Sequence, residues 1–128
     1  MLPKTRIKIH TKPGIGKAVF AIVEVHTREK VIESRPIKTV PCPNRYSLEL
    51  NGNHIIIDEP GMLVNHSCDP NCVIVPNAYG AFDFIACRKI QKDEEITFDY
   101  ESNESEITAF SNCYCGAKNC RKTMNKNR

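Results

Sequence analysis

Three stretches of this chain are more informative than the rest: Asn65-His-Ser-Cys-Asp-Pro-Asn71, Glu94-Glu-Ile-Thr-Phe-Asp-Tyr100 and Cys113-Tyr-Cys-Gly-Ala-Lys-Asn-Cys120. The third places three thiols within reach of one tetrahedral zinc ion, and Gly116 permits the tight backbone turn that this requires. A closed structural zinc site has four ligands, so one more thiolate is expected from elsewhere. The alternative is a group of unliganded thiols. The residues alone leave four candidates for the fourth ligand: Cys42, Cys68, Cys72 and Cys87.

Length and composition exclude several classes of protein. A chain of 128 residues is expected to form one domain. Its 41% hydrophobic and 26% charged residues exclude wholesale disorder. No apolar run reaches the ~18 residues of a membrane span, and Met1–His10 lacks the apolar stretch of a signal peptide. We therefore expect a soluble, intracellular protein without a membrane partner, nuclear or cytoplasmic, in which clustered cysteines bind metal rather than form disulfides.

The spacing of apolar residues predicts a mostly β fold, because β-branched residues recur at every second position between turn residues. The 8 prolines and 6 glycines interrupt the chain too often for a helical bundle. Only Gly61–Asn65 and Ser102–Thr108 are expected to be helical. The expected strands are Thr5–His10, Ala18–Val25, Lys30–Ser34, Tyr46–Leu50, His54–Asp58, Cys72–Pro76, Phe82–Cys87 and Glu95–Phe98.

Charge is segregated near the C-terminus. Residues 93–106 hold seven acidic side chains and no Lys or Arg, whereas residues 107–128 hold five basic side chains and no acid. The simplest interpretation of both segments is a solvated face. The basic side chains would also partly neutralise a zinc ion held by four thiolates. The net charge of +3 does not by itself predict direct nucleic-acid binding.

In their order and spacing, the three stretches closely resemble a SET-domain protein lysine methyltransferase with its post-SET zinc segment. The resemblance extends to Gly16-Lys-Ala-Val-Phe-Ala21, which is similar to the glycine-rich opening of the family, and to Glu24–Glu33, where Arg28 replaces the usual turn glycine. It implies a SET-domain (β-clip) fold of small curved sheets with a knot-like crossing. Residues 1–108 would form the SET domain and residues 109–128 the post-SET segment.

The resemblance implies a role for each site residue. Cys68 is selected as the fourth zinc ligand, which gives one structural zinc ion held by Cys68, Cys113, Cys115 and Cys120. Tyr100 is the expected catalytic tyrosine, Phe98 controls how many methyl groups fit, and Tyr46 lines the lysine channel. S-adenosylmethionine would be bound by Asn65 and His66, by Gly16, Lys17 and Ala18 of the N-terminal strand, and by Met124 in place of the usual aromatic residue.

The implied activity is S-adenosylmethionine-dependent methylation of a lysine side chain in a protein or peptide, with histones among the candidate partners. A lysine amine has an ordinary pKa of about 10.4, so deprotonating it at pH 7 costs about 4 to 5 kcal/mol. Holding the amine in line with a methyl donor contributes about 7 to 11 kcal/mol. A narrow aromatic channel is therefore sufficient without a strong base. The acidic segment 93–106 could steer a cationic substrate toward it.

Three other classes of protein compete with this hypothesis. A catalytically inactive SET-like module that binds a partner and uses zinc only for folding would explain Ala18, which stands where the family has a second glycine. A zinc-finger nucleic-acid binder would explain the basic tail, but it leaves the other two stretches without a purpose. A cysteine hydrolase would use Cys68 or Cys72 with His66.

Overall fold

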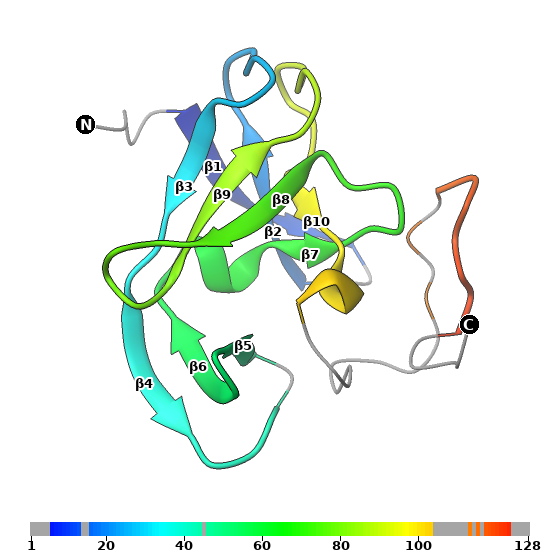
Figure 1. Ribbon diagram of the computed structural model, residues 1–128. Coiled ribbons are helices and arrows are strands. Elements are labelled where there is room, and N and C mark those ends of the chain that lie inside the picture. The colour runs from blue at the N-terminus through cyan, green and yellow to red at the C-terminus, as the bar shows by residue number, and fades with distance from the viewer. Residues whose placement is uncertain are drawn as a thin grey trace.

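The structure is a computed structural model that describes residues 6–13, 16–44, 46–103, 113, 115 and 117–123. Within these residues the chain forms short strands in small sheets, as expected of a mostly β protein (Figure 1). No helix among them has the length and apolar character needed to cross a bilayer. Two sheets are two-stranded: β1 (Ile7–Lys12) with β2 (Gly16–Ala21), and β7 (Asn65–His66) with β10 (Thr97–Phe98).

The other two sheets have three antiparallel strands each. Their strand orders are β4-β6-β5 and β3-β9-β8. The first contains β4 (Pro36–Val40), β6 (Asn53–Ile57) and β5 (Leu48–Leu50), and the second contains β3 (Lys30–Glu33), β9 (Phe82–Ala86) and β8 (Cys72–Pro76). Two single 3-10 turns, η2 (Gly61–Leu63) and η3 (Tyr100–Ser102), flank the β7 and β10 pair.

Most predicted elements are present, with shifted ends. The strand predicted at Cys72–Pro76 has those bounds, and the strand predicted at Ala18–Val25 is wrong beyond Ala21, where the chain bends. The prediction of a strand from Tyr46 is wrong for its first two residues, since β5 begins at Leu48. The helix predicted at Gly61–Asn65 is only the turn η2, because Asn65 already belongs to a strand.

The other ends also move. The strands predicted to end at Ser34, Asp58 and Cys87 each end one residue earlier, and the strand predicted from Glu95 begins at Thr97. The strand predicted at Thr5–His10 is found as β1, two residues farther along, and Thr5 lies outside the described residues. Of the helical segment predicted at Ser102–Thr108, only Ser102 and Asn103 are described, and Ser102 ends η3.

One contiguous core holds the sheets together. Phe84 of β9, Ile57 of β6 and Val19 of β2 are fully buried, as are Ile90 and Ile96 of the segment that leads into β10. Full burial of such side chains contributes about 1.5 to 3 kcal/mol each. The ring of Phe84 packs edge-on against Phe98 at 5.6 Å between centroids, so the core extends directly to β10, the strand that precedes Tyr100.

The turn before β3 shows how the chain accommodates a missing glycine. Arg28 adopts φ 76°, a left-handed conformation that favours glycine. Its backbone N–H donates to the Ala86 carbonyl at 2.7 Å, and that of Ala86 donates to the Glu29 carbonyl at 2.9 Å. These bonds fix the turn against β9, so the backbone conformation is kept although the residue is not glycine.

The parallel pairing of β7 and β10 brings two distant motifs side by side. Asn65 faces Thr97 and His66 faces Phe98, and the Ser67 N–H donates to the Phe98 carbonyl at 3.1 Å. Two-residue strands are weak alone, and the side chain of Asn71 supports this pair. Its amide donates to the Glu95 carbonyl at 2.7 Å and accepts from the Thr97 N–H at 2.9 Å.

Asn71→Leu is expected to lower the free energy of unfolding by about 2 to 5 kcal/mol, because it leaves the Glu95 carbonyl and the Thr97 N–H without a partner in a buried site. Urea denaturation measures the change. Asn71→Asp is the informative companion, since it keeps the acceptor for Thr97 but places a carboxylate 3.1 Å from the position that Glu94 occupies. If both variants have the same free energy of unfolding as the wild type, Asn71 does not stabilise the pairing of β7 with β10.

Candidate active site and metal centre

The C-terminal thiols meet the thiol that follows β7. The sulfur atoms of Cys68, Cys113, Cys115 and Cys120 all lie within 4.8 Å of one another. Those of Cys68 and Cys113 are 3.9 Å apart. A tetrahedral zinc ion with bonds of about 2.3 Å separates its thiolates by about 3.8 Å. The four sulfurs therefore fit a structural zinc ion, and Cys68, rather than the other three candidates, is the cysteine that joins the C-terminal group.

Backbone groups prepare these thiols for a cation. Burial raises the pKa of the Cys115 thiol, but the N–H groups of Cys68 and Ala117 donate to its sulfur and lower the pKa to about 6. Burial raises the pKa of the Cys68 and Cys113 thiols. Metal binding must therefore displace protons, so acid weakens it. The Asn119 amide closes the loop by donating to the Cys68 carbonyl at 2.9 Å.

His66 links the thiol cluster to the tyrosine turn. The backbone N–H of Tyr100 donates to Nδ1 of His66 at 3.0 Å, so Nδ1 accepts and the proton of the neutral ring lies on Nε2. Nε2 is 3.3 Å from the Cys68 sulfur and donates to it. Burial lowers the pKa of His66, which favours this neutral form. Both ring nitrogens of His66 are therefore engaged inside the protein.

Arg121 makes a second link between the same two regions. Its guanidinium donates twice to the Asp99 carboxylate and once to Glu101 at 2.9 Å, and its backbone N–H donates to the Cys68 sulfur at 3.4 Å. Burial raises the pKa of Asp99, but Arg121 outweighs burial and holds that pKa below its usual range. Two carboxylates of the acidic segment are thus paired with a basic side chain of the C-terminal segment. For these two residues, the interpretation as a solvated face does not hold.

The predicted cofactor residues of the Asn65 stretch and of the N-terminal strand β2 also lie close together. The Asn65 side-chain amide donates to the Glu95 carboxylate at 3.0 Å and approaches the Lys17 carbonyl at 3.5 Å. These contacts use the N–H groups of the amide and not its carbonyl oxygen. Gly16 adopts φ 104°, which favours glycine, and Ala18 is fully buried. Met124 lies outside the described residues.

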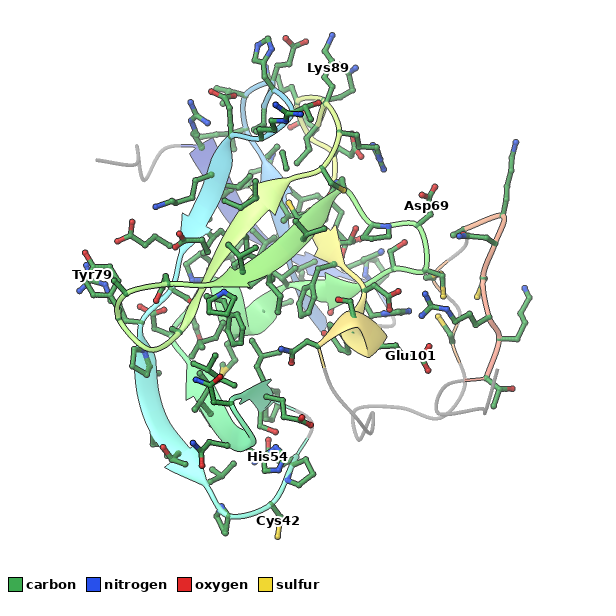
Figure 2. The ribbon with its side chains drawn as sticks, viewed as in Figure 1. Cys42, His54, Asp69, Tyr79, Lys89 and Glu101 are labelled. Atoms are coloured by element: carbon green, nitrogen blue, oxygen red, sulfur yellow. The ribbon has the colours of Figure 1, made fainter. Side chains whose placement is uncertain are left out.

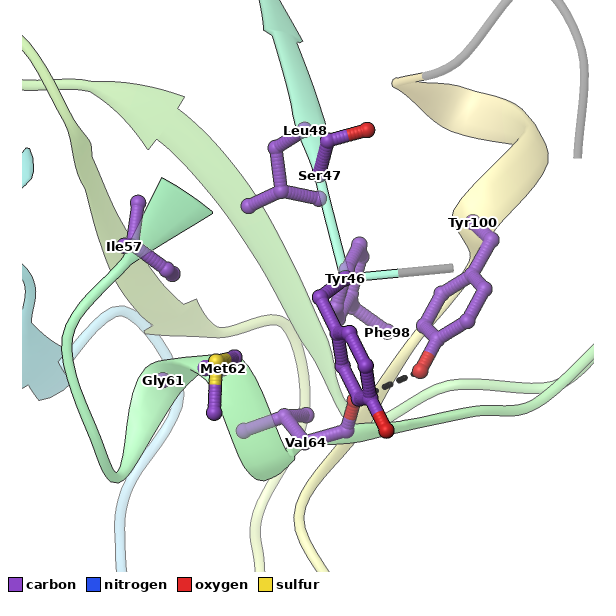
Figure 3. Close-up of a pocket in the computed structure, with 9 residues that line it drawn as sticks. All are labelled: Tyr46, Ser47, Leu48, Ile57, Gly61, Met62, Val64, Phe98 and Tyr100. Atoms are coloured by element: carbon purple, nitrogen blue, oxygen red, sulfur yellow. Dashed lines mark hydrogen bonds between the residues drawn. The ribbon is translucent and has the colours of Figure 1, made fainter. Parts of the chain in front are cut away.

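A pocket of about 300 Å³, counting space open to solvent, lies beside this arrangement. Figure 3 shows the rings of Tyr46 and Tyr100 facing it, with both hydroxyls on the side of Val64. The Tyr100 hydroxyl donates to the Val64 carbonyl at 2.8 Å. Phe98 is buried beside Tyr100, with 4.9 Å between ring centroids. The lining residues are Tyr46, Ser47, Leu48, Ile57, Gly61, Met62, Val64, Phe98 and Tyr100.

Sequence reasoning named three of these lining residues and missed the other six. Met62 and Val64 lie just before the Asn65 motif. Their spacing of two residues is the only pattern in the sequence that could have indicated that they line the pocket. Gly61 is needed for close packing, because a Cβ atom there would meet the Ile57 Cδ1 at 2.8 Å and the Phe84 Cε1 at 3.2 Å. The contacts of Arg121 with Asp99 and Glu101 also lacked a local signal.

Of the cysteines outside the cluster, Cys72 carries no sign of nucleophilic chemistry. Burial raises the pKa of Cys72 to about 12, so its thiol is protonated and inert at neutral pH. Cys42 is exposed at the tip of the loop between β4 and β5, away from the C-terminal segment (Figure 2). The cysteine-hydrolase alternative is therefore not supported, since Cys68 belongs to the thiol cluster.

The fold and the site define a SET domain, and the chain belongs to that family, whose model matches residues 15–101. Over 107 residues, or 77% of this chain, it is 36% identical to human histone-lysine N-methyltransferase 2D. It is 35% identical over 93 residues to an H3 lysine-9-specific histone-lysine N-methyltransferase of Fusarium mangiferae, 61% of this chain. The chain spans only 2% and 26% of the length of these relatives.

Solved structures show the same fold. KRYPTONITE in complex with mCHH DNA, H3(1–15) peptide and SAH superposes with a TM-score of 0.74, at 22% identity, over 96% of this chain and 30% of that one. The methyltransferase domain of human SETMAR superposes with a TM-score of 0.69, at 19% identity, over 91% of this chain and 56% of that one. The predicted SET fold is thereby confirmed.

We expect the purified protein to retain about one zinc ion per chain after dialysis, and Cys113→Ser to retain little, because a three-thiolate site binds zinc more weakly. Metal content by plasma emission spectrometry measures both. The matched control is Cys42→Ser, which removes an exposed thiol outside the cluster and leaves the zinc content unchanged. A wild-type protein that loses its zinc as readily as Cys113→Ser contradicts the assignment.

Proposed function

We propose that the chain is a protein-lysine N-methyltransferase that uses S-adenosylmethionine. The observation that carries the proposal is the position of Tyr100. Its hydroxyl is fixed by the Val64 carbonyl beside a pocket that Tyr46 and Phe98 also line, and its backbone is tied through His66 to the segment predicted to bind the cofactor. The family membership and the bound SAH of KRYPTONITE support the choice of cofactor.

The pocket suits a lysine side chain. Its walls are aromatic and aliphatic, and among the nine described lining residues none carries a carboxylate or an imidazole. An ammonium group that enters loses hydration, which favours the neutral amine needed for methyl transfer. When bound, the cofactor supplies a methyl group on a positively charged sulfur. The proton leaves to water before transfer, because none of these described lining residues is a general base.

Tyr100 orients the amine. Because the phenol donates its proton to the Val64 carbonyl at 2.8 Å, the phenolic oxygen presents lone pairs that can accept from an amine N–H. The hydroxyl of Tyr46, on the same side of the pocket, adds a second polar group (Figure 3). Orientation of this kind contributes more than deprotonation costs, with about 7 to 11 kcal/mol available from positioning.

We further propose a protein substrate with an exposed lysine, and histone H3 as the first to test. Its support is the H3 peptide bound by KRYPTONITE and the H3 specificity of the Fusarium mangiferae relative. In this proposal residues 1–108 form the SET domain and residues 109–128 the post-SET segment, with one structural zinc ion. A histone substrate would place the protein in the nucleus.

Tyr100→Phe is expected to lower methyl transfer at least about 100-fold, because it removes the oxygen that orients the amine. The assay counts labelled methyl groups transferred to H3 peptide and to whole histones. Tyr79→Phe is the matched control, since Tyr79 is exposed and stacks under Arg35 away from the pocket. A wild-type protein that binds S-adenosylmethionine but methylates no lysine would instead be a SET-like binding module.

Phe98→Tyr is expected to shift the product toward monomethyl lysine. Phe98 is buried against Tyr100, and a hydroxyl added at its ring would hold a water molecule in the space that additional methyl groups need. Mass spectrometry of the modified peptide at equal total turnover gives the distribution of products, with the wild type progressing beyond one methyl group. Identical distributions for the two proteins would refute the role of Phe98.

A further inference from the structure

Asn103 ends the turn that carries Tyr100 and reaches across to a distant strand. Its backbone N–H donates to the Tyr100 carbonyl at 3.1 Å, which closes η3. Its side-chain amide donates to the Glu49 carbonyl at 2.8 Å, and its amide oxygen accepts from the Glu49 N–H at 2.9 Å. One side chain thus satisfies both backbone groups of a residue 54 positions away.

This contact has the geometry of a strand neighbour. Glu49 is the middle residue of β5, which is the edge strand of the sheet β4-β6-β5 and pairs with β6 through Glu49 and His54. The Asn103 amide occupies the open edge of β5, where another strand would otherwise pair. Figure 1 shows η3 as the yellow turn that follows β10, whereas β5 belongs to the sheet β4-β6-β5, so the amide joins two elements that no sheet connects.

Both elements contribute to the lining of the pocket. Leu48 of β5 lines it together with Tyr46 and Ser47 of the preceding loop, and Tyr100 of η3 lines it as well. The loop before β5 is held as a unit, because the Asn44 side chain accepts from the Tyr46 N–H at 2.8 Å and the Asn44 N–H donates to the Ser47 hydroxyl at 2.8 Å. A displacement of β5 is therefore transmitted to the Tyr46 wall.

We propose that Asn103 is a positioning residue that sets the width of the pocket, by clamping the Tyr100 turn to the wall that carries Tyr46. A clamp is needed because η3 and β5 are short. They have three residues each, and such short elements are stabilised mainly by their neighbours. The consequence for lysine rests on the proposed function, whereas the clamp itself rests on the hydrogen bonds alone.

The first test is structural and needs no activity. Amide hydrogen exchange by NMR is expected to show Glu49 protected in the wild type and exchanging at least about 10-fold faster in Asn103→Leu, which lacks both bonds. Asn103→Asp, which keeps the acceptor but not the donor, is a second variant should Asn103→Leu fail to fold, and its exchange is expected to be intermediate. Equal exchange at Glu49 in the wild type and in a folded variant overturns the clamp.

The second test separates positioning from stability. We expect Asn103→Leu to lower kcat/KM for a lysine peptide by about 10- to 100-fold, because misplacement by about 1 Å can cost about 100-fold. A wider pocket should also shift the products toward higher methylation at equal turnover. The affinity for S-adenosylmethionine and the zinc content stay within about twofold of the wild type, since the two lost bonds join Asn103 to β5 and not to the cofactor or zinc residues.

Ser102→Ala is the matched control. It removes a hydrogen bond of the same turn, from the Ser102 hydroxyl to the Asp99 carbonyl, without touching β5. We expect it to leave the distribution of products unchanged. If Asn103→Leu loses activity only in proportion to its folded fraction, with unchanged products, the positioning role is overturned. If the wild type transfers no methyl group, the proposed function fails, and the exchange experiment still decides the clamp.

Discussion

The parallel contact between Asn65-His66 and Thr97-Phe98 is the constraint on which the rest of the site depends. Two residues on each side cannot form a stable sheet by themselves, because each strand contributes too few hydrogen bonds to offset the entropy of ordering it. Two buried polar side chains of the first motif, Asn71 and His66, complete the pairing by accepting from the Thr97 and Tyr100 N–H groups of the second. This explains why a segment rich in polar residues lies inside the protein.

The crossing also brings the thiol cluster next to the tyrosine. Cys68 follows β7 by two residues and Tyr100 follows β10 by two, so parallel pairing places both at the same end of the pair. A metal-bound tail at that point would stabilise a small core, which a chain of 128 residues needs more than a large one. Arg121 adds an ionic contact to Asp99 in the same place.

The sequence predicted those features that reside in local patterns. Cys72–Pro76 is rich in β-branched residues and was found as a strand, and the C-terminal thiols predicted a metal site from their spacing alone. Two strands were missed for physical reasons. β4 begins with proline and is largely exposed, as an edge strand can be. Asn65–His66 has no strand propensity and pairs only because a distant segment lies beside it.

The unpredicted parts of the site share one property: their partners are remote in sequence. Asn103 and Glu49 are 54 positions apart, and Arg121 and Asp99 are 22 apart. Neither pair has a spacing rule, because the relevant distance is set by the tertiary fold and not by the period of a strand or helix. Met62 of the turn η2 also lines the pocket, and its place there is likewise set by the tertiary fold.

None of the described residues that line the pocket is an acid or a base, so in the proposed function the pocket acts through placement, and the hydrogen bonds around Tyr100 are consistent with that requirement. Its hydroxyl is held by Val64, its N–H by His66 and its carbonyl by Asn103. The contacts with Val64 and His66 come from outside the turn η3, and the contact with Asn103 closes that turn. Such restraint has little value for a core tyrosine, whose packing alone would suffice, but it is what a group needs when its entire contribution is the direction of one oxygen.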